Sequence, residues 1–157
     1  MIDASDRVLL VRLRFDDGFD GWILPGGGVE DGEDHHQALV REVSEETGAP
    51  NVFVGPPLWH RTTLLAGMGG GRWDGQHNTT YLVPTRGFDP APELSAEDLL
   101  AEGMVDVQWW TVDEISQAEA NVVKPDGLAA LIEQVLAHGA PAEPWDLGTH
   151  DSVRRST

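Results

Sequence analysis

The feature that most constrains this chain is an acidic segment at residues 26–48, GGGVEDGEDHHQALVREVSEETG. It contains seven Asp and Glu residues, and Arg41 is its single Lys or Arg. Like charges this close together repel one another and destabilise a folded chain. The segment is therefore either a solvated surface or a place where something cationic binds.

The second half of this segment has the pattern of a capped amphipathic helix. Asp34 is a candidate N-cap, and Gln37 follows three residues later, as in a capping box. Leu39 and Val43 stand four residues apart and define an apolar face. Gly48 occupies the place of a C-terminal glycine cap. We therefore predict a helix between Asp34 and Gly48.

Three carboxylates share another face of this predicted helix. Glu42, Glu45 and Glu46 are related as i, i+3 and i+4, so their side chains lie together. Carboxylate oxygens suit Mg²⁺ or Mn²⁺ rather than zinc, and bound Mg²⁺ commonly contacts substrate phosphates as well. The glycines in front let the backbone approach a bound group closely. The pattern indicates a metal site for a phosphate substrate; the alternative is an acidic helix face that is merely solvated.

Composition narrows the class of protein. The 157 residues suffice for one domain, and the absence of cysteine excludes disulfides, thiolate catalysis and Cys-ligated zinc. No apolar run approaches the roughly 18 residues of a membrane span, and the start has no signal-peptide pattern, so we expect a cytoplasmic protein without membrane contact. A net charge of −17 argues against sequence-independent nucleic-acid binding, which needs clustered basic residues.

Strand and helix patterns alternate irregularly along the chain. Such mixing favours the α+β class, with a mixed sheet covered by helices. A Gly-rich loop is expected at residues 67–78, and the Pro-rich, polar tail at residues 139–157 is expected to be loosely held. Strands are predicted at residues 7–14, 22–24, 51–58, 59–66, 79–83 and 105–111, and later helices within residues 111–118 and 125–139.

The acidic segment also resembles the motif of a known family. From Gly27 it runs through five residues to Glu33 and through seven more to REVSEETG at residues 41–48. This resembles the Nudix box, G-x5-E-x7-R-E-U-x-E-E-x-G-U, where U is a bulky apolar residue. The seven fixed positions match, Val43 fits the first U, and Ala49 at the last U is smaller than usual.

The resemblance implies a fold and its extent. The expected fold is a Nudix-type α/β/α sandwich with a mixed sheet and a Nudix loop-helix, formed by residues 1–138. Family members usually have a further strand before the one predicted at residues 7–14. Only six residues precede Arg7 here, so we expect either a bare sheet edge or a natural start further upstream.

By the same resemblance, Glu42, Glu45 and Glu46 are expected to bind the metal, with the Gly26 carbonyl as a further ligand. Glu33 and Arg41 are expected to brace the loop against the helix through a bidentate contact. That pair could equally have a purely structural role.

Other residues are weaker candidates. Glu30 could approach the metals through water, and Glu102 is our preferred general base, although the acidic residues of its segment could simply be solvated. The base alternatives are Glu97 and Asp98.

The substrate pocket is predicted from glycines, arginines and tryptophans. Gly27 would approach the substrate closely, and Trp22 could stack on a base or belong to the core. Arg61 and Arg72 could bind phosphate groups, and a surface hairpin without a ligand fits the same pattern.

The resemblance implies Mg²⁺-dependent hydrolysis, with Mn²⁺ as a substitute, of a diphosphate linkage in a small nucleotide by a monomer or homodimer. We favour a nucleoside triphosphate, canonical or damaged, giving a nucleoside monophosphate and pyrophosphate. The alternative is an ADP-ribose or nucleotide-sugar pyrophosphatase, and a non-catalytic nucleotide sensor is a distant third. The missing cysteine speaks against the related isoprenoid-diphosphate isomerases, and the negative charge against decapping of long RNA.

Overall fold

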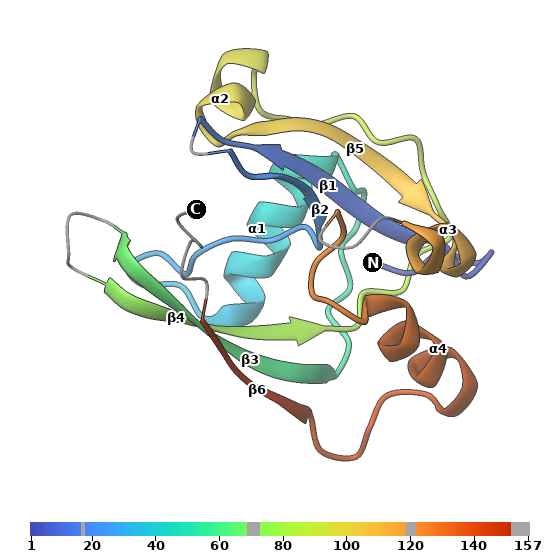
Figure 1. The fold of residues 1–157 in the computed structure, drawn as a ribbon. Helices are drawn as coiled ribbons and strands as arrows, with labels where there is room; N and C mark the ends of the chain where they lie inside the picture. Colours follow the sequence, from blue (N-terminus) through green and yellow to red (C-terminus); the bar gives the residue numbers. More distant parts are fainter. Residues whose placement is uncertain (17, 69–72, 119–121, 152–157) are drawn as a thin grey trace. The chain divides into compact units, whose positions relative to one another are not determined.

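The computed structural model of the protein describes residues 1–16, 18–68, 73–118 and 122–151. Figure 1 shows its helices and its strands, and the strands form two sheets. The strands are β1 (Val8–Arg14), β2 (Asp20–Ile23), β3 (Pro57–Met68), β4 (Trp73–Tyr81), β5 (Met104–Trp110) and β6 (Trp145–Asp151). The helices are α1 (His35–Thr47), α2 (Ala96–Ala101), α3 (Val112–Gln117) and α4 (Leu128–His138).

The chain divides into two compact units. The first comprises Met1–Val54 and Val83–Gly139, and the second comprises Gly55–Leu82 and Ala140–Thr157. The first unit contains the acidic segment and all of the helices, whereas the second contains strands β3, β4 and β6. None of the helices in the described ranges is long and apolar enough to cross a membrane.

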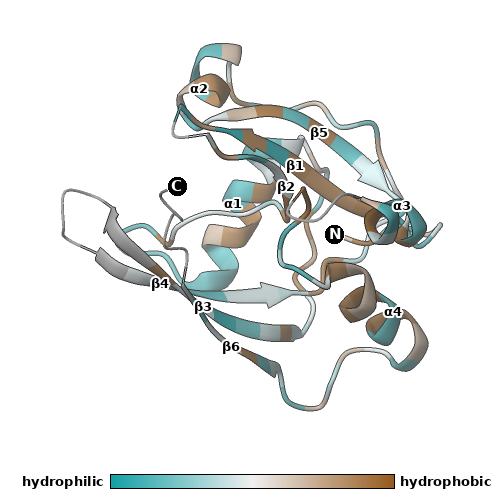
Figure 2. Cartoon of the chain, viewed as in Figure 1, coloured by the Kyte–Doolittle hydropathy of each residue, from teal (hydrophilic) through white to brown (hydrophobic). Residues whose placement is uncertain are grey.

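In the first unit, β1 is the central strand of an antiparallel sheet with the order β2-β1-β5. Val8, Leu9, Leu10 and Val11 are fully buried. The hydrophobic stretch of β1 is brown in Figure 2. Because successive side chains of a strand point to opposite faces, both faces of this sheet are covered.

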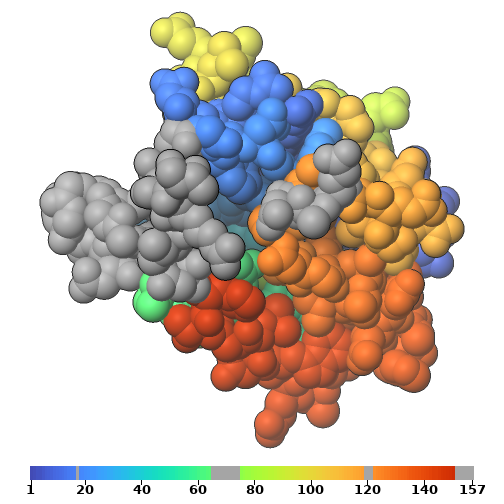
Figure 3. Space-filling model, viewed as in Figure 1, coloured from blue at the N-terminus to red at the C-terminus, as the bar shows by residue number. Residues whose placement is uncertain are grey.

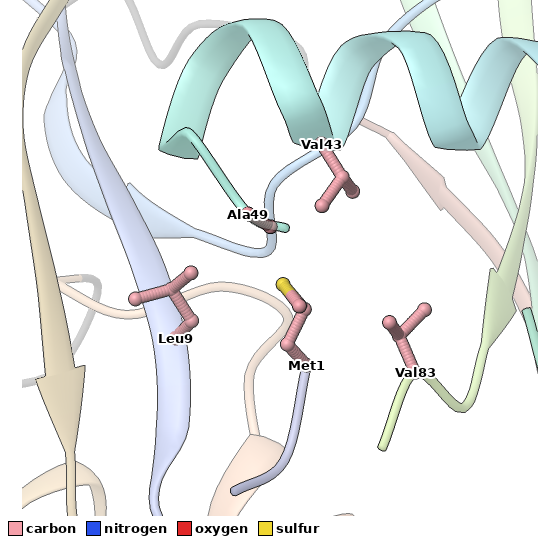
Figure 4. Packing of buried hydrophobic residues seen from close by; sticks show 5 residues of the cluster. All are labelled: Met1, Leu9, Val43, Ala49 and Val83. Carbon is pink, nitrogen blue, oxygen red and sulfur yellow. The ribbon is translucent and has the colours of Figure 1, made fainter. Parts of the chain in front are cut away.

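One of these faces packs against α1. Figure 4 shows Leu9 of β1 and Val43 of α1 directed toward Met1, with Ala49 and Val83 completing the cluster. Ala49, the small residue at the last apolar position of the box, is 5% exposed and belongs to this core. Glu46 is buried on α1 together with Val43, whereas Glu42 and Glu45 are half-buried, so the carboxylates begin beside the packed side of the helix.

Two further helices complete the first unit. Thr111 caps α3 through a capping box with Glu114. Helix α4 buries Leu128, Ile132 and Val135. The two helices lie against each other, and in the space-filling view their orange side chains form one continuous part of the surface (Figure 3).

The second unit is a sheet with the order β4-β3-β6, in which β3 pairs antiparallel with β4 and parallel with β6. The α+β class is thus confirmed. The mixed strand pairing is confirmed as well: the strands of the described chain form two three-stranded sheets, and this second one is mixed.

Three local predictions need correction. Residues 51–56 form no strand: Asn51 has φ 54°, and Phe53 is 67% exposed, so this segment lacks the alternating burial of a strand. Trp73 to Asn78, predicted as loop, belong to β4, because pairing with β3 satisfies their backbone despite Gly75. The tail is not loose over Trp145–Asp151, since this segment is β6 and pairs with β3.

Candidate active site

Helix α1 positions the carboxylates of the site, and its ends are formed as the sequence predicts. The Asp34 carboxylate accepts a hydrogen bond from the Gln37 N–H, and the Gln37 side chain accepts one from the Asp34 N–H. At the other end Gly48 has φ 68° and donates its N–H to the Ser44 carbonyl. Both ends of the helix are therefore satisfied locally, which sets the register of the glutamates between them.

Arg41 ties the loop to the helix. Its Nε and Nη2 donate to the two carboxylate oxygens of Glu33 at 2.8 and 2.9 Å, which is the bidentate contact predicted. Nη2 also donates to the Gly28 carbonyl at 3.0 Å. The remaining nitrogen, Nη1, reaches Glu42 at 2.9 Å and Glu45 at 3.4 Å. One guanidinium thus contacts three carboxylates and the loop backbone.

These contacts set the charge state of the brace. Hydrogen bonds from Arg41, followed by the backbone N–H of Glu30, lower the pKa of Glu33 from 4.5 to about 2. The same contact with Glu33 raises the pKa of Arg41 above its ordinary value. Both groups are charged at neutral pH, so the pair is a permanent ionic clamp. Glu30 is at the edge of this clamp, with its carboxylate 4.0 Å from Arg41 and 71% exposed.

Glu46 lies deepest among the glutamates of α1. It is 6% exposed, and its Oε2 accepts a hydrogen bond from the Gly26 N–H at 2.8 Å. Burial, followed by the negative charges of Glu42, Glu102 and Glu45, raises the pKa of Glu46 to about 7, although the bond from Gly26 opposes the shift. A carboxylate held in this state would be stabilised by a cation.

The loop approaches the helix closely at Gly27. A Cβ atom added to Gly27 would collide with the carboxylate of Glu42, whereas one added to Gly28 would meet nothing within 4 Å. This difference explains the glycine at the first position of the box by close packing. Gly27 is therefore part of the wall around Glu42.

Glu102 is the one later acid that the structure brings into this group. It follows α2, and its charge raises the pKa of both Glu42 and Glu46. Burial is the larger cause for each of them, and for Glu42 the hydrogen bond from Arg41 works in the opposite direction. Asp98 instead caps α2 together with Ser95. Proximity thus favours Glu102 over Asp98 as the acid that could act beside the box.

The carboxylates of Glu42, Glu45 and Glu46 suit a hard divalent cation, but their oxygens do not surround a common point. Within the described ranges, no three acidic or histidine side chains form a group that could hold a metal ion. The reason is visible in the hydrogen bonds: Arg41 engages Glu42 and Glu45, and Gly26 engages Glu46. Metal binding would require these carboxylates to exchange partners.

The predicted pocket residues have different locations. Trp22 is 7% exposed, and its ring packs edge-on against Trp110 at 5.1 Å, so it is a core residue and does not offer a free face to a base. Arg61 lies on β3 in the second unit. Arg72 is outside the described residues.

The sequence did not reveal which backbone groups hold the side chains of the site. The Gly26 N–H and the Gly28 carbonyl hold Glu46 and Arg41. Backbone partners carry no residue-type signature, and the only available sign was the glycine run itself.

Comparison with known proteins agrees with this geometry. The family model described as NUDIX domain matches residues 1–131. Nudix hydrolase 25 of Arabidopsis thaliana is 28% identical over 131 residues, covering 77% of this chain and 74% of the relative. An RNA pyrophosphohydrolase of Novosphingobium aromaticivorans is 34% identical over 106 residues, covering 62% of this chain and 66% of the relative, slightly under two thirds of its length.

A solved structure is similar as well. A NUDIX hydrolase from Nitrosomonas europaea superposes with a TM-score of 0.65 and 26% identity, over 88% of this chain and 86% of the other. The matched range contains the complete box with its arginine clamp and glutamate group. The chain belongs to the NUDIX family and is a Nudix hydrolase, a class of enzyme that acts on pyrophosphate bonds.

Proposed function

We propose that this protein hydrolyses a diphosphate linkage in a nucleotide with the help of a divalent metal ion. The observation that carries the proposal is the buried carboxylate of Glu46, which accepts a hydrogen bond from the Gly26 N–H at 2.8 Å. Burial, with the negative charges of Glu42, Glu102 and Glu45, raises the pKa of Glu46, so a cation bound here would offset negative charge.

The metal would be held by Glu42, Glu45 and Glu46, with the Gly26 carbonyl as a further ligand. Oxygen donors of this kind suit Mg²⁺, for which Mn²⁺ can substitute. When bound, the metal supplies a Lewis acid for the phosphoryl oxygens and lowers the pKa of a coordinated water.

The remaining residues have positioning roles. Arg41 holds Glu33 and the loop in place, and it limits the repulsion between Glu42 and Glu45 by contacting both. Glu102 is our candidate for the general base, because its charge acts on both Glu42 and Glu46 and its side chain belongs to an exposed residue that water can reach.

A nucleoside triphosphate is the proposed substrate, and the products would be a nucleoside monophosphate and pyrophosphate. A net charge of −17 favours a small ligand that makes few contacts outside the metal site. A second candidate is the 5′-triphosphate end of an RNA, and the observation that favours it is the similarity to an RNA pyrophosphohydrolase. Both substrates present the same three phosphates to the carboxylate group.

The test is a hydrolysis assay with Mg²⁺ and then Mn²⁺. The panel comprises canonical and oxidised nucleoside triphosphates, a short RNA with a 5′-triphosphate, ADP-ribose and sugar nucleotides. We expect pyrophosphate from a nucleoside triphosphate, and no product from Glu46→Gln. A higher kcat/KM for the RNA would move the assignment to the second candidate, and AMP from ADP-ribose would contradict both. A folded wild-type protein that converts nothing on the panel would favour nucleotide sensing.

A further inference from the structure

The C-terminal end of α1 is capped by a segment that lies far away in the sequence. The last carbonyls of a helix have no partner within the helix itself. Here the Thr47 carbonyl accepts a hydrogen bond from the Ala91 N–H at 3.0 Å, and the Glu45 carbonyl accepts one from the Glu93 N–H at 2.9 Å. The Leu94 N–H lies 3.4 Å from the same Glu45 carbonyl. Backbone contacts therefore fix residues 90–94, which we call the strap, on the helix that carries the box glutamates.

The sequence of the strap suits this contact. It begins Pro-Ala-Pro-Glu, and Pro90 and Pro92 have a fixed φ and no backbone N–H. A residue that precedes proline favours an extended backbone, which applies to Ala91. In an extended chain, N–H groups two residues apart point to the same side. Ala91 and Glu93 are thus the N–H donors of this stretch, and both of them meet carbonyls of α1.

The strap also lies close to the helix end at Gly48. This residue has φ 68°, and a Cβ atom added to it would collide with the Ala91 carbonyl. Because that carbonyl belongs to the backbone, no change of side-chain rotamer relieves the collision. Gly48 therefore ends α1 and also leaves the room that the strap occupies.

Helix α2 follows the strap and is held weakly by its own side chains. None of its residues is buried, and Leu100 is 66% exposed. A short helix without a packed apolar face depends on its attachments for its position. Glu102 comes directly after α2, and the next carbonyl, that of Gly103, accepts the Arg14 N–H at 2.8 Å. The segment that contains α2 and Glu102 is thus attached by backbone hydrogen bonds at both ends, to α1 through the strap and to β1 through Gly103.

We propose that the strap is a positioning element that holds Glu102 at a fixed distance from the glutamates of α1. The Glu93 N–H is bound to the carbonyl of Glu45, so the strap is tied to the backbone of a proposed metal ligand. The charge of Glu102 acts on both Glu42 and Glu46, so the far end of the segment lies near the same helix. The proposal rests on the function proposed above, in which Glu102 is the general base. Misplacing a reacting group by about 1 Å can reduce a rate by about 100-fold, so this attachment matters for the reaction.

A loosened strap tests this role in the full-length protein. Pro90→Gly with Pro92→Gly frees the backbone of the strap and keeps both N–H donors. The matched control is Pro141→Gly with Pro144→Gly, which removes two prolines from the similar sequence Pro-Ala-Glu-Pro before β6. For hydrolysis of a nucleoside triphosphate, we expect kcat to fall about tenfold in the strap variant, with KM within about twofold of the wild-type value. The control should retain wild-type kcat.

A double-mutant cycle separates the positioning of Glu102 from a general structural effect. If the strap acts through Glu102, loosening it in the Glu102→Gln background lowers kcat by less than about twofold. Where Glu102→Gln itself lowers kcat, an equal loss in both backgrounds, or no loss in either, would overturn the proposal. Mg²⁺ affinity measured by calorimetry should be the same in the wild type and the strap variant. A weaker affinity in the strap variant would also overturn the proposal, because the strap would then act on the metal ligands of α1.

Amide hydrogen exchange measures the attachment without turnover. We expect the Ala91 and Glu93 N–H groups to be protected in the wild type. In the strap variant the amides of α2 should exchange faster, while those of α1 keep their protection. Equal exchange of α2 in the wild type and the strap variant would contradict the proposal. If the double variant does not fold, the same measurements on Pro92→Gly alone decide.

The inference and the proposed function can fail separately. Wild-type kcat in Glu102→Gln would refute Glu102 as the general base, and hydrogen exchange of α2 would then decide the role of the strap. A large loss of kcat in Glu102→Gln, together with unchanged kcat and unchanged exchange in the strap variant, would keep the base and refute the strap.

Discussion

The loop and helix of residues 26–48 and the sheet of β3, β4 and β6 treat charge in opposite ways. In the first region Arg41 contacts three carboxylates at once, and the remaining negative charge is gathered around buried Glu46. In the second region histidines and threonines pair with each other, while Arg61 has no partner among the described residues. In the first region carboxylates outnumber the single arginine, whereas in the second region the buried Nε of Arg61 has no acceptor among the described residues.

A charged group without a nearby opposite charge is therefore a better indication of a functional site than a charged group as such. An acidic helix face is usually only solvated, and Glu133 on α4 is an exposed example. The box differs because burial and neighbouring carboxylates together raise the pKa of Glu46.

The largest expected effect comes from Glu46→Gln. Replacing the carboxylate removes a proposed metal ligand, and metal stabilisation of the transition state is worth several kcal/mol, so kcat should fall by more than about 100-fold. Steady-state kinetics with circular dichroism will check this. Glu133→Gln is the matched control and should retain wild-type kcat. Normal turnover in Glu46→Gln would remove Glu46 from the mechanism.

The second effect is on the pH dependence of metal-free stability. The folded-state pKa of Glu46 is about 7 against an ordinary 4.5, so the folded state binds this proton more tightly than the unfolded state does. The free energy of unfolding should therefore decrease as pH rises from 4.5 to 7, by an amount on the order of 3 kcal/mol for this group. Denaturant titrations in EDTA should show this decrease in the wild type and a smaller one in Glu46→Gln.

The pKa of Glu33 is shifted in the opposite direction, so this residue affects stability in a different pH range. Its pKa is lowered to about 2, so its contribution to the free energy of unfolding is present above pH 4.5 and is lost as pH falls toward 2. For the Glu46 prediction, the contradicting result would be a free energy of unfolding that decreases equally between pH 4.5 and 7 in the wild type and in Glu46→Gln.

A third prediction concerns the close approach of the loop. Gly27→Ala places a Cβ against the Glu42 carboxylate, so the loop or Glu42 must move, which should cost about 1–3 kcal/mol and reduce kcat about tenfold. Gly28→Ala has open space and is the control. Thermal melts and kcat should separate the two variants. Similar values for both would show that the contact with Glu42 is not needed.

The smallest effect is expected in the second region. Thr79→Val removes the hydroxyl that pairs with His60, and loss of one such hydrogen bond costs about 1 kcal/mol. Because our proposal gives neither residue a role in the reaction, kcat should stay at the wild-type value. Denaturant unfolding measures the first quantity and the hydrolysis assay the second. A large loss of kcat would place His60 in the reaction.

Sequence reasoning performed best where contacts are local. The capping box of α1 was predicted because Asp34 and Gln37 are three residues apart, and the Glu33–Arg41 contact was implied by the resemblance to the Nudix box. It failed for β4, where the many glycines suggested a loop. Pairing with β3 decides that segment, and a partner strand cannot be read from the glycines themselves.

The sequence by itself determined the family motif, the helix that carries it and the carboxylates on one face, because spacing along a helix follows from its period. Only the tertiary structure decided that Glu46 is buried under Gly26, that Trp22 belongs to the core and that β6 pairs with β3. It also left Arg61 without a partner in the described chain. Burial and pairing depend on segments distant in sequence, and no local pattern specifies which of them will meet.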